Sequence, residues 1–310
     1  MLALELVSRK IEVSICTNKA QWYSYEATAS KETTKTNTYT IKNCEWLPDA
    51  QAYKSLTKPL DGFEDLVSDC SGEFVISDNY LEPLLYTDFG LIFANFFWHR
   101  ELGLRNPKWD ELEQNVTERG TKFAGNIFAK PYASEKSSFE YFPLFGRRKR
   151  QALSRGYIIL VLGHGSWVPG YEYIFSEYLE DITREYAGTC YVDPTISMEA
   201  LVSLDGVDYE LAAITEDLIA HAEAVVGRPS LGIVADCMCA GVPFFPIAMV
   251  DDLEAIHNKN IVTQLFSTPK ESYEIKHRTR IRNRLADNRA QVDGERALSA
   301  RIAELMIGVE

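Results

Sequence analysis

The sequence predicts an α/β fold in which a mostly parallel sheet is flanked by helices, after a β-rich N-terminal portion and before a helical C-terminal segment. Two short apolar runs, residues 157–162 and 231–235, are rich in β-branched or small side chains and are stopped by turn residues. Such runs are typical of strands buried on both faces, as in parallel sheets. Helical spacing between the two runs indicates the crossover connections of a doubly wound sheet.

Elements of the first half are predicted from local periodicity. Residues 11–15 alternate with period two and predict a half-buried strand, and residues 74–76 predict another. Residues 28–40 are dense in Thr, Lys and Ser and indicate a loop or an edge strand. Residues 80–100 predict a buried core element of either type, and residues 109–119 a helix with an acidic face.

Elements of the second half of the chain are also predicted from local periodicity. After the strand at 157–162, residues 171–186 have helical spacing, and residues 189–210 indicate an irregular or β-containing excursion. Thr215 is a suitable N-cap for a helix that continues to residue 226 and stops at Gly227-Arg228-Pro229. Strands are then expected at 231–235 and 260–266, and helical structure at 275–306.

A run of four cations, Arg147-Arg148-Lys149-Arg150, divides the chain into residues 1–150 and 151–310. We interpret residues 1–150 as a β-rich or mixed portion that resembles a pro-domain or supplies the first strands of the sheet. The run is typical of a solvated loop at a boundary. A cleavage site or a docking patch for an acidic partner is the alternative interpretation.

Composition restricts the partners and the compartment. The net charge is −13, which argues against nucleic acid as a partner and suits a cationic ligand. Six cysteines at irregular spacing indicate a reducing compartment rather than a disulfide framework. The apolar window at 80–98 contains charged residues, so it is expected in a core and not in a membrane. We therefore predict a cytoplasmic protein without a membrane partner.

Reactive side chains are expected at the carboxyl ends of the two buried runs. His164 follows the first run, and Cys237 and Cys239 follow the second. Open α/β sheets place their ligand-binding and active sites at this edge. An imidazole beside a thiol is the pair of groups that a site with a cysteine nucleophile requires. Alternatively, Cys237 and Cys239 bind a metal together with Cys190 or His221. Buried cysteines are usually inert, and this is how we interpret Cys16, Cys44, Cys70 and Cys190. No Gly-x-Ser-x-Gly, phosphate loop or dinucleotide fingerprint is present.

Three segments resemble the caspase-like cysteine peptidases, the group of caspases and metacaspases. They are Leu162-Gly163-His164-Gly165-Ser166, residues 214–237 with their Asp236-Cys237 ending, and residues 266–273. The resemblance implies the caspase-like fold for residues 151–310 and a cysteine endopeptidase that acts on proteins or peptides through an acyl-enzyme. It implies no metal and no cofactor. Autoprocessing near residues 147–150 and an activating protein partner belong to the same hypothesis.

The resemblance also assigns residue roles. His164 would be the general base and acid, and the backbone N–H of Gly165 would stabilise the oxyanion. The Cys-x-Gly spacing selects Cys239 as nucleophile, whereas the Asp-Cys step selects Cys237. Asp236 resembles the acid that lines a basic-residue pocket, which would place Arg or Lys before the scissile bond. Met238 stands where the commonest family spacing has the nucleophile, so an inactive caspase-like scaffold or binding protein is the alternative.

Overall fold

The structure is a computed structural model. It describes residues 2–17, 40–43, 56, 58–68, 74–101, 103, 106–129, 139–144, 156–161, 189–194, 208–250, 252–266 and 294–307. The chain forms two compact units. Unit 1 comprises Met1–Phe142 together with Gly294–Glu310, and unit 2 comprises Pro143–Asp293. The functional division expected at residue 150 stays a prediction.

The main sheet of unit 1 has four parallel strands whose spatial order, β3-β4-β5-β6, follows the chain. The strands are β3 (Val75–Asp78), β4 (Gly90–Phe93), β5 (Lys122–Asn126) and β6 (Phe139–Phe142). Strands that pair in chain order with right-handed crossovers place their connections on one face of the sheet. These connections contain a 3-10 helix η1 (Glu82–Tyr86), α5 (Trp98–Glu101) and α6 (Pro107–Glu118).

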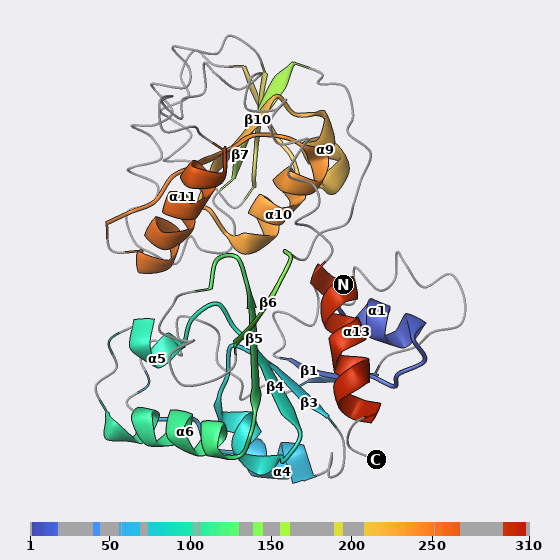
Figure 1. The fold of residues 1–310 in the computed structure, drawn as a ribbon. Helices are drawn as coiled ribbons and strands as arrows, with labels where there is room; N and C mark the ends of the chain where they lie inside the picture. The colour runs from blue at the N-terminus through green and yellow to red at the C-terminus, as the bar shows by residue number, and fades with distance from the viewer. Residues whose placement is uncertain are drawn as a thin grey trace. The chain divides into compact units, whose positions relative to one another are not determined.

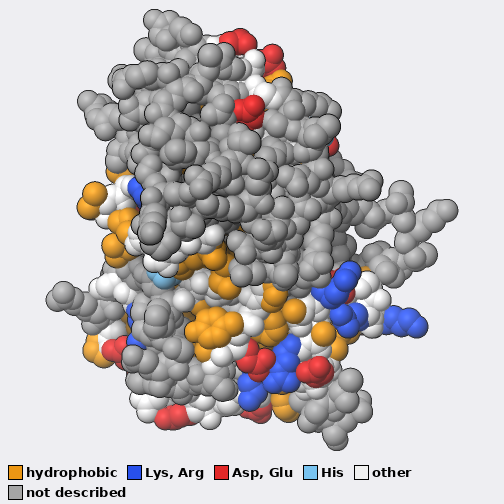
Figure 2. All heavy atoms as spheres, turned by 45° about the horizontal axis from the view of Figure 1, so that its top comes forward, with side chains coloured by type: hydrophobic (Ala, Val, Ile, Leu, Met, Phe, Trp, Pro, Cys, Tyr) orange, Lys and Arg blue, Asp and Glu red, His pale blue; other side chains and the backbone are white. Residues whose placement is uncertain are grey.

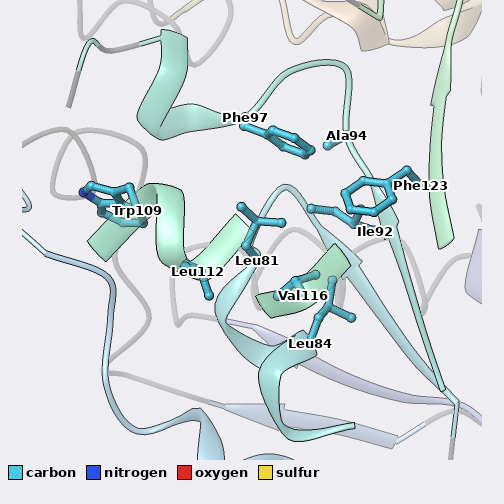
Figure 3. Packing of buried hydrophobic residues seen from close by; sticks show 9 residues of the cluster. All are labelled: Leu81, Leu84, Ile92, Ala94, Phe97, Trp109, Leu112, Val116 and Phe123. Atoms are coloured by element: carbon cyan, nitrogen blue, oxygen red, sulfur yellow. The ribbon is translucent and has the colours of Figure 1, made fainter. Parts of the chain in front are cut away.

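Helix α6 forms where the 109–119 spacing predicts a helix. Asn106 caps it by accepting a hydrogen bond from the backbone N–H of Lys108 at 3.0 Å, and Pro107 occupies the first turn. Its buried face carries Trp109, Leu112 and Val116 into the core. Figure 3 shows these side chains together with those of the sheet and of the turn that follows β4. The helical spacing of 3.6 residues is therefore what builds this core.

Unit 1 also contains α13 (Gly294–Ile307), the last helix among the described residues. Helix α13 contacts β6 and α1 (Leu2–Ser8), and Arg301 of α13 forms a two-nitrogen ion pair with Glu140 of β6. The other elements are a parallel pair of strands, β1 (Ser14–Thr17) and β2 (Thr40–Asn43), and α4 (Phe63–Ser68) beside η1. Both ends of the sequence thus belong to one unit.

Unit 2 contains a five-stranded parallel sheet in the order β11-β10-β7-β8-β9. Its strands are β7 (Tyr157–Val161), β8 (Thr189–Val192), β9 (Tyr209–Leu211), β10 (Ala224–Gly227) and β11 (Phe244–Pro246). Among the described residues of unit 2, the helices, which Figure 1 shows alongside the strands, are α9 (Glu216–His221), α10 (Leu231–Ala240) and α11 (Leu253–Phe266). Strands β7 and β10 are buried throughout, as parallel strands covered on both faces must be.

The predicted α/β class with parallel sheets flanked by helices is confirmed. The strand at 157–162 and the Thr215 cap are also confirmed, since Thr215 Oγ1 accepts a hydrogen bond from the N–H of Leu218 at 3.2 Å. The strand expected at 74–76 is found as β3, and the one expected at 11–15 lies at Ser14–Thr17. The helix expected at 171–186 lies outside the described residues.

Three element assignments were wrong, and all lie after Thr215. Residues 224–227, expected in a helix, form strand β10. Residues 231–235, expected as the strand carrying the thiols, begin helix α10, and residues 260–266 lie in α11. For α10, the reason is that it is apolar on nearly every side. A fully buried helix lacks the polar face by which helical periodicity is recognised.

No helix within the described ranges combines the length and apolar character that crossing a membrane requires. On the face shown in Figure 2, the acidic, basic and hydrophobic side chains that the structure describes lie interspersed. That pattern is ordinary for a surface in contact with water.

Candidate functional site

The residues selected for the peptidase hypothesis lie mostly on one helix. Cys237 and Cys239 lie on α10, where their exposed fractions are 0% and 4%. Asp236 lies on the same helix and is half-buried. Burial raises the pKa of the Cys237 thiol well above its ordinary value, and the charges of Asp236 and of Cys239 raise it further. A raised thiol pKa disfavours the thiolate that nucleophilic catalysis needs. His164 and Gly165 lie outside the described residues.

The expected metal alternative has no geometric counterpart among the described residues. No group of three or more His, Cys, Asp or Glu side chains comes together there in a way that could hold an ion. Cys190 is buried in β8, where burial and, to a smaller extent, Asp208 raise its thiol pKa to about 12. This thiol is therefore protonated at neutral pH.

The strand order of unit 2 identifies a different site. From β7 the chain proceeds to β8 and β9 on one side, then returns to place β10 and β11 on the other side. The order reverses between β7 and β10, which makes their carboxyl ends the topological switch point of the sheet. In open α/β sheets, ligands bind at this point, outside the carboxyl ends of the strands.

Gly227 ends β10 at the switch point and allows the two central strands to approach. A Cβ atom at this residue would lie 1.6 Å from the carbonyl oxygen of Val161 in β7. The same oxygen accepts a hydrogen bond from the backbone N–H of Arg228 at 3.2 Å. On the other side, the carbonyl of Gly227 accepts from the N–H of Ile247 at 2.7 Å. Only glycine fits between these neighbours.

Arg228 follows Gly227 and anchors the turn between β10 and α10. Its guanidinium is buried and donates to both oxygens of Asp252, at 2.7 and 3.3 Å, and to Glu254 at 3.0 Å. These two carboxylates raise the pKa of Arg228 against the opposing effect of burial, which is the larger single influence. Asp252 in turn caps α11, because its Oδ1 accepts from the N–H of Ala255 at 3.0 Å.

A second contact holds the same turn from α11. The buried Asn258 donates from its Nδ2 to the carbonyl of Pro229 at 2.9 Å. The turn of Gly227, Arg228, Pro229 and Ser230 is thus bound to β7, β11 and α11 by hydrogen bonds whose partners are mostly buried. A backbone fixed this way is preorganised to hold a ligand.

The first turn of α10 emerges from this anchored turn. Ser230 is its N-cap, the Ser230 side chain makes no capping hydrogen bond, and the first turn contains no acidic residue. Gly232, in the first turn, is exposed, and a Cβ atom there would meet nothing within 4 Å. Helix N-termini bind anions through their N–H groups and the helix dipole. Asp236 lies one turn along the helix from Gly232, on the same face.

Sequence reasoning missed this turn as a site, because Gly227-Arg228-Pro229 was interpreted as the stop of a helix. The signal that could have found it is the order of elements: a β-branched run, Gly, and then Pro-Ser before an apolar helical run. Pro-Ser in that place fits the start of a helix at least as well as the end of one.

A comparison with models of protein families finds no match, and no curated protein sequence matches this chain. Solved structures do match. The glycosyltransferase SnogD from Streptomyces nogalater aligns at a TM-score of 0.60 with 13% identity, over 98% of this chain and 94% of that one. An Arabidopsis thaliana UGT in complex with UDP-L-rhamnose aligns at 0.59 with 12% identity over the same shares.

A third structure, the Streptomyces glycosyltransferase SsfS6 in complex with thymidine diphosphate, aligns at a TM-score of 0.55 with 13% identity, over 98% of this chain and 94% of that one. At these identities the similarity establishes the fold alone, and the fold is similar to that of these glycosyltransferase structures. The caspase-like resemblance is therefore wrong. The hypotheses that depended on this resemblance are wrong as well. They are the hydrolase with an acyl-enzyme, autoprocessing, the protein or peptide substrate and the inactive caspase-like scaffold.

Proposed function

We propose that this chain transfers a glycosyl group from a nucleoside diphosphate sugar to an acceptor hydroxyl. In that reaction the bond between the sugar C1 and the diphosphate oxygen breaks, and the nucleoside diphosphate leaves with the bonding electrons. A bond from C1 to the acceptor oxygen forms, and the hydroxyl loses its proton. The fold supports this proposal, as do the nucleotide ligands of the two nucleotide-bound structures, UDP-L-rhamnose and thymidine diphosphate.

One observation carries the proposal to particular residues: the open first turn of α10 at the switch point of unit 2. The diphosphate is assigned to the N–H groups of this turn, where the positive end of the helix dipole favours an anion. Arg228 is assigned a positioning role, because its guanidinium is already bound to two carboxylates. Gly232 permits close approach, since no side chain stands between the backbone and the diphosphate.

Gly232→Leu tests the diphosphate assignment. The added side chain occupies the space above the first turn, so we expect UDP and TDP to bind at least about tenfold more weakly, by isothermal titration calorimetry. The helix itself should form, because a Cβ atom at this residue meets nothing within 4 Å. Lys108→Leu is the matched control, at the corresponding position of α6. Equal nucleotide affinity in Gly232→Leu and wild type would remove α10 from the proposal.

Asp236→Asn tests which part of the nucleotide extends along α10. A carboxylate one turn from the diphosphate, about 5.4 Å along the axis, is placed to accept hydrogen bonds from the ribose hydroxyls. We expect UDP affinity to fall by about tenfold to a hundredfold, since a hydrogen bond to a charged group contributes about 1.5–3 kcal/mol.

Pyrophosphate, which has no ribose, provides the internal control for this variant. Its affinity should be unchanged or slightly higher in Asp236→Asn, because a negative charge near the diphosphate is removed. Asp110→Asn, an exposed position on α6, controls for the change in net charge. A parallel loss of UDP and pyrophosphate affinity would contradict the ribose assignment.

A further inference from the structure

Two asparagine side chains lie at the carboxyl ends of the central strands of unit 1. Asn126 is the last residue of β5, and Asn95 follows β4 by two residues. Phe93 pairs with Ala124 across the two strands, so Asn95 and Asn126 lie at the same level of the sheet. The backbone N–H of Asn126 donates to Asn95 Oδ1 at 3.1 Å.

Each of these carboxamides uses its oxygen within the protein and leaves its nitrogen available. Asn95 Oδ1 accepts from Asn126, and Asn126 Oδ1 accepts from the N–H of Phe128 at 2.9 Å. These two acceptor contacts fix which atom of each amide is the nitrogen. Neither nitrogen has a hydrogen-bond partner among the described residues, although the two residues are only 6% and 3% exposed.

A buried donor without an acceptor is unusual, because most buried polar groups are hydrogen-bonded. The fully enclosed polar atoms without a partner in the described part of the chain are Glu82 Oε2 and Trp109 Nε1, so the nitrogens of Asn95 and Asn126 are not among them. Together they present four N–H donors at one edge of a parallel sheet.

The two donors are held rigidly. Ala94 donates from its N–H to the carbonyl of Ala124 at 2.9 Å, and Ala94 and Phe97 point into the core (Figure 3). After β5, Ala129 donates to the carbonyl of Asn126 at 2.9 Å, and Phe128 is fully buried. Donors fixed in this way bind without a large ordering cost.

The charges nearby favour a neutral ligand. Asp78, at the carboxyl end of β3, is ionised at neutral pH although burial raises its pKa to about 6, so it disfavours an anion at this edge and can accept a hydrogen bond from a hydroxyl. Arg100, the nearest cation after β4 among the described residues, donates two hydrogen bonds to Glu113, at 2.7 and 2.6 Å. Hydroxyl groups both accept and donate, so they satisfy the amides and the carboxylate together.

We propose that the carboxyl edge of the unit 1 sheet binds a neutral, hydroxyl-rich compound of the sugar class, with the carboxamide nitrogens of Asn95 and Asn126 donating to its oxygens. The proposal that this edge binds such a compound depends only on these contacts. Its role as the acceptor site of a glycosyl transfer rests on the proposed function.

The test follows the carboxamide signals directly. In protein labelled with ¹⁵N, the side-chain NH₂ resonances of the two asparagines are assigned by their loss in Asn95→Asp and Asn126→Asp. Titration with methyl β-D-glucopyranoside should shift both resonance pairs along a saturable curve. Cyclohexanol, a ring with one hydroxyl, should shift them far less. If neither pair moves with the glucoside, the proposal is overturned.

The two variants provide the second measurement. An aspartate keeps the oxygen that accepts from the backbone but replaces the NH₂ donors by an acceptor, so the glucoside should bind at least about tenfold more weakly. Asn115→Asp, the same change at an exposed position of α6, should bind as wild type does. Unchanged affinity in both variants would overturn the proposal, and should a variant fail to fold, the wild-type titration decides.

Failure of this proposal and failure of the proposed function give different results. Nucleotide binding is measured on unit 2 residues and glucoside binding on unit 1 residues. Glucoside binding without UDP or TDP binding contradicts the glycosyl transfer alone. Nucleotide binding without glucoside binding contradicts the asparagine site alone.

Discussion

Gly227→Ala is expected to destabilise unit 2 by about 3 kcal/mol or more, the upper part of the range for overpacking a close-packed site. The added Cβ atom would lie 1.6 Å from Val161 O, 2.7 Å from Val161 C and 3.0 Å from Val161 Cγ1. Two of these atoms are backbone, so no side-chain rotation relieves the contact. Strands β7 and β10 must separate, and the hydrogen bond from Arg228 N–H to Val161 O is lost with them.

Amide hydrogen exchange, read at residues 157–161 and 224–227, measures this effect within unit 2. The protection of both strands should fall in Gly227→Ala. Gly232→Ala is the matched control, because its Cβ atom meets nothing within 4 Å and alanine favours a helix over glycine by up to about 1 kcal/mol. If the two variants retain equal protection, the close approach of the two strands at Gly227 is refuted.

Arg228→Met has the second large expected effect, about 3–5 kcal/mol, the usual result of removing one partner of a buried ion pair. Asp252 is as deeply buried as Arg228 and would lose its ionic partner. Glu254, which is more exposed, can turn to water at a lower cost. Of the described contacts between the turn before α10 and α11, the hydrogen bond from Asn258 to Pro229 would remain, so the turn would be held less firmly and UDP and TDP affinity should fall together with stability.

Chemical denaturation with a matched substitution isolates the effect of burial. Arg301→Met removes an ion pair of similar geometry with Glu140, but both of its partners are about one-third exposed. Its cost should be about 0–1 kcal/mol, as for other solvent-accessible pairs. Equal costs in Arg228→Met and Arg301→Met would contradict the importance of burial at Arg228.

A double variant separates the uncompensated charge from the lost contact. Arg228→Met combined with Asp252→Ser removes the buried carboxylate and keeps an N-cap for α11. It should recover more than half of the loss, because an apolar replacement of a buried pair is often close to neutral. A double variant no more stable than Arg228→Met alone would contradict the effect assigned to the uncompensated charge of Asp252.

Helices and strands could be predicted from the sequence where an element has one polar and one apolar face. They could also be predicted where a helix begins at one of the few residue types that can cap it. Helix α6 was predicted within two residues of its observed bounds because Trp109, Leu112 and Val116 recur at helical spacing. Thr215 was recognised because few side chains can cap a helix. Strand β7 was recognised by a continuous β-branched run of strand length.

The candidate site was missed for the opposite reason. Residues 224–227 and 231–240 are both short, apolar and almost fully buried, so periodicity does not tell which is the strand and which the helix. The prediction made residues 224–227 helical and residues 231–235 a strand. It therefore placed the two thiols at the end of a strand, where a nucleophile would be expected, although they lie on a helix. Asp236 was selected as a ligand residue for a cleft that the fold does not support, and it stays a candidate only through its new position on α10.

The sequence by itself determined the α/β class, the first buried strand of unit 2, helix α6 and the Thr215 cap, because these follow from composition and from contacts between near neighbours in the chain. Only the tertiary structure decided that Gly227 must be glycine and that Arg228 is held by Asp252 and Glu254. It also decided that Asn95 and Asn126 lie at one level of a sheet. Each of these facts depends on which strand lies beside which, and pairing between distant segments is not encoded in any local pattern.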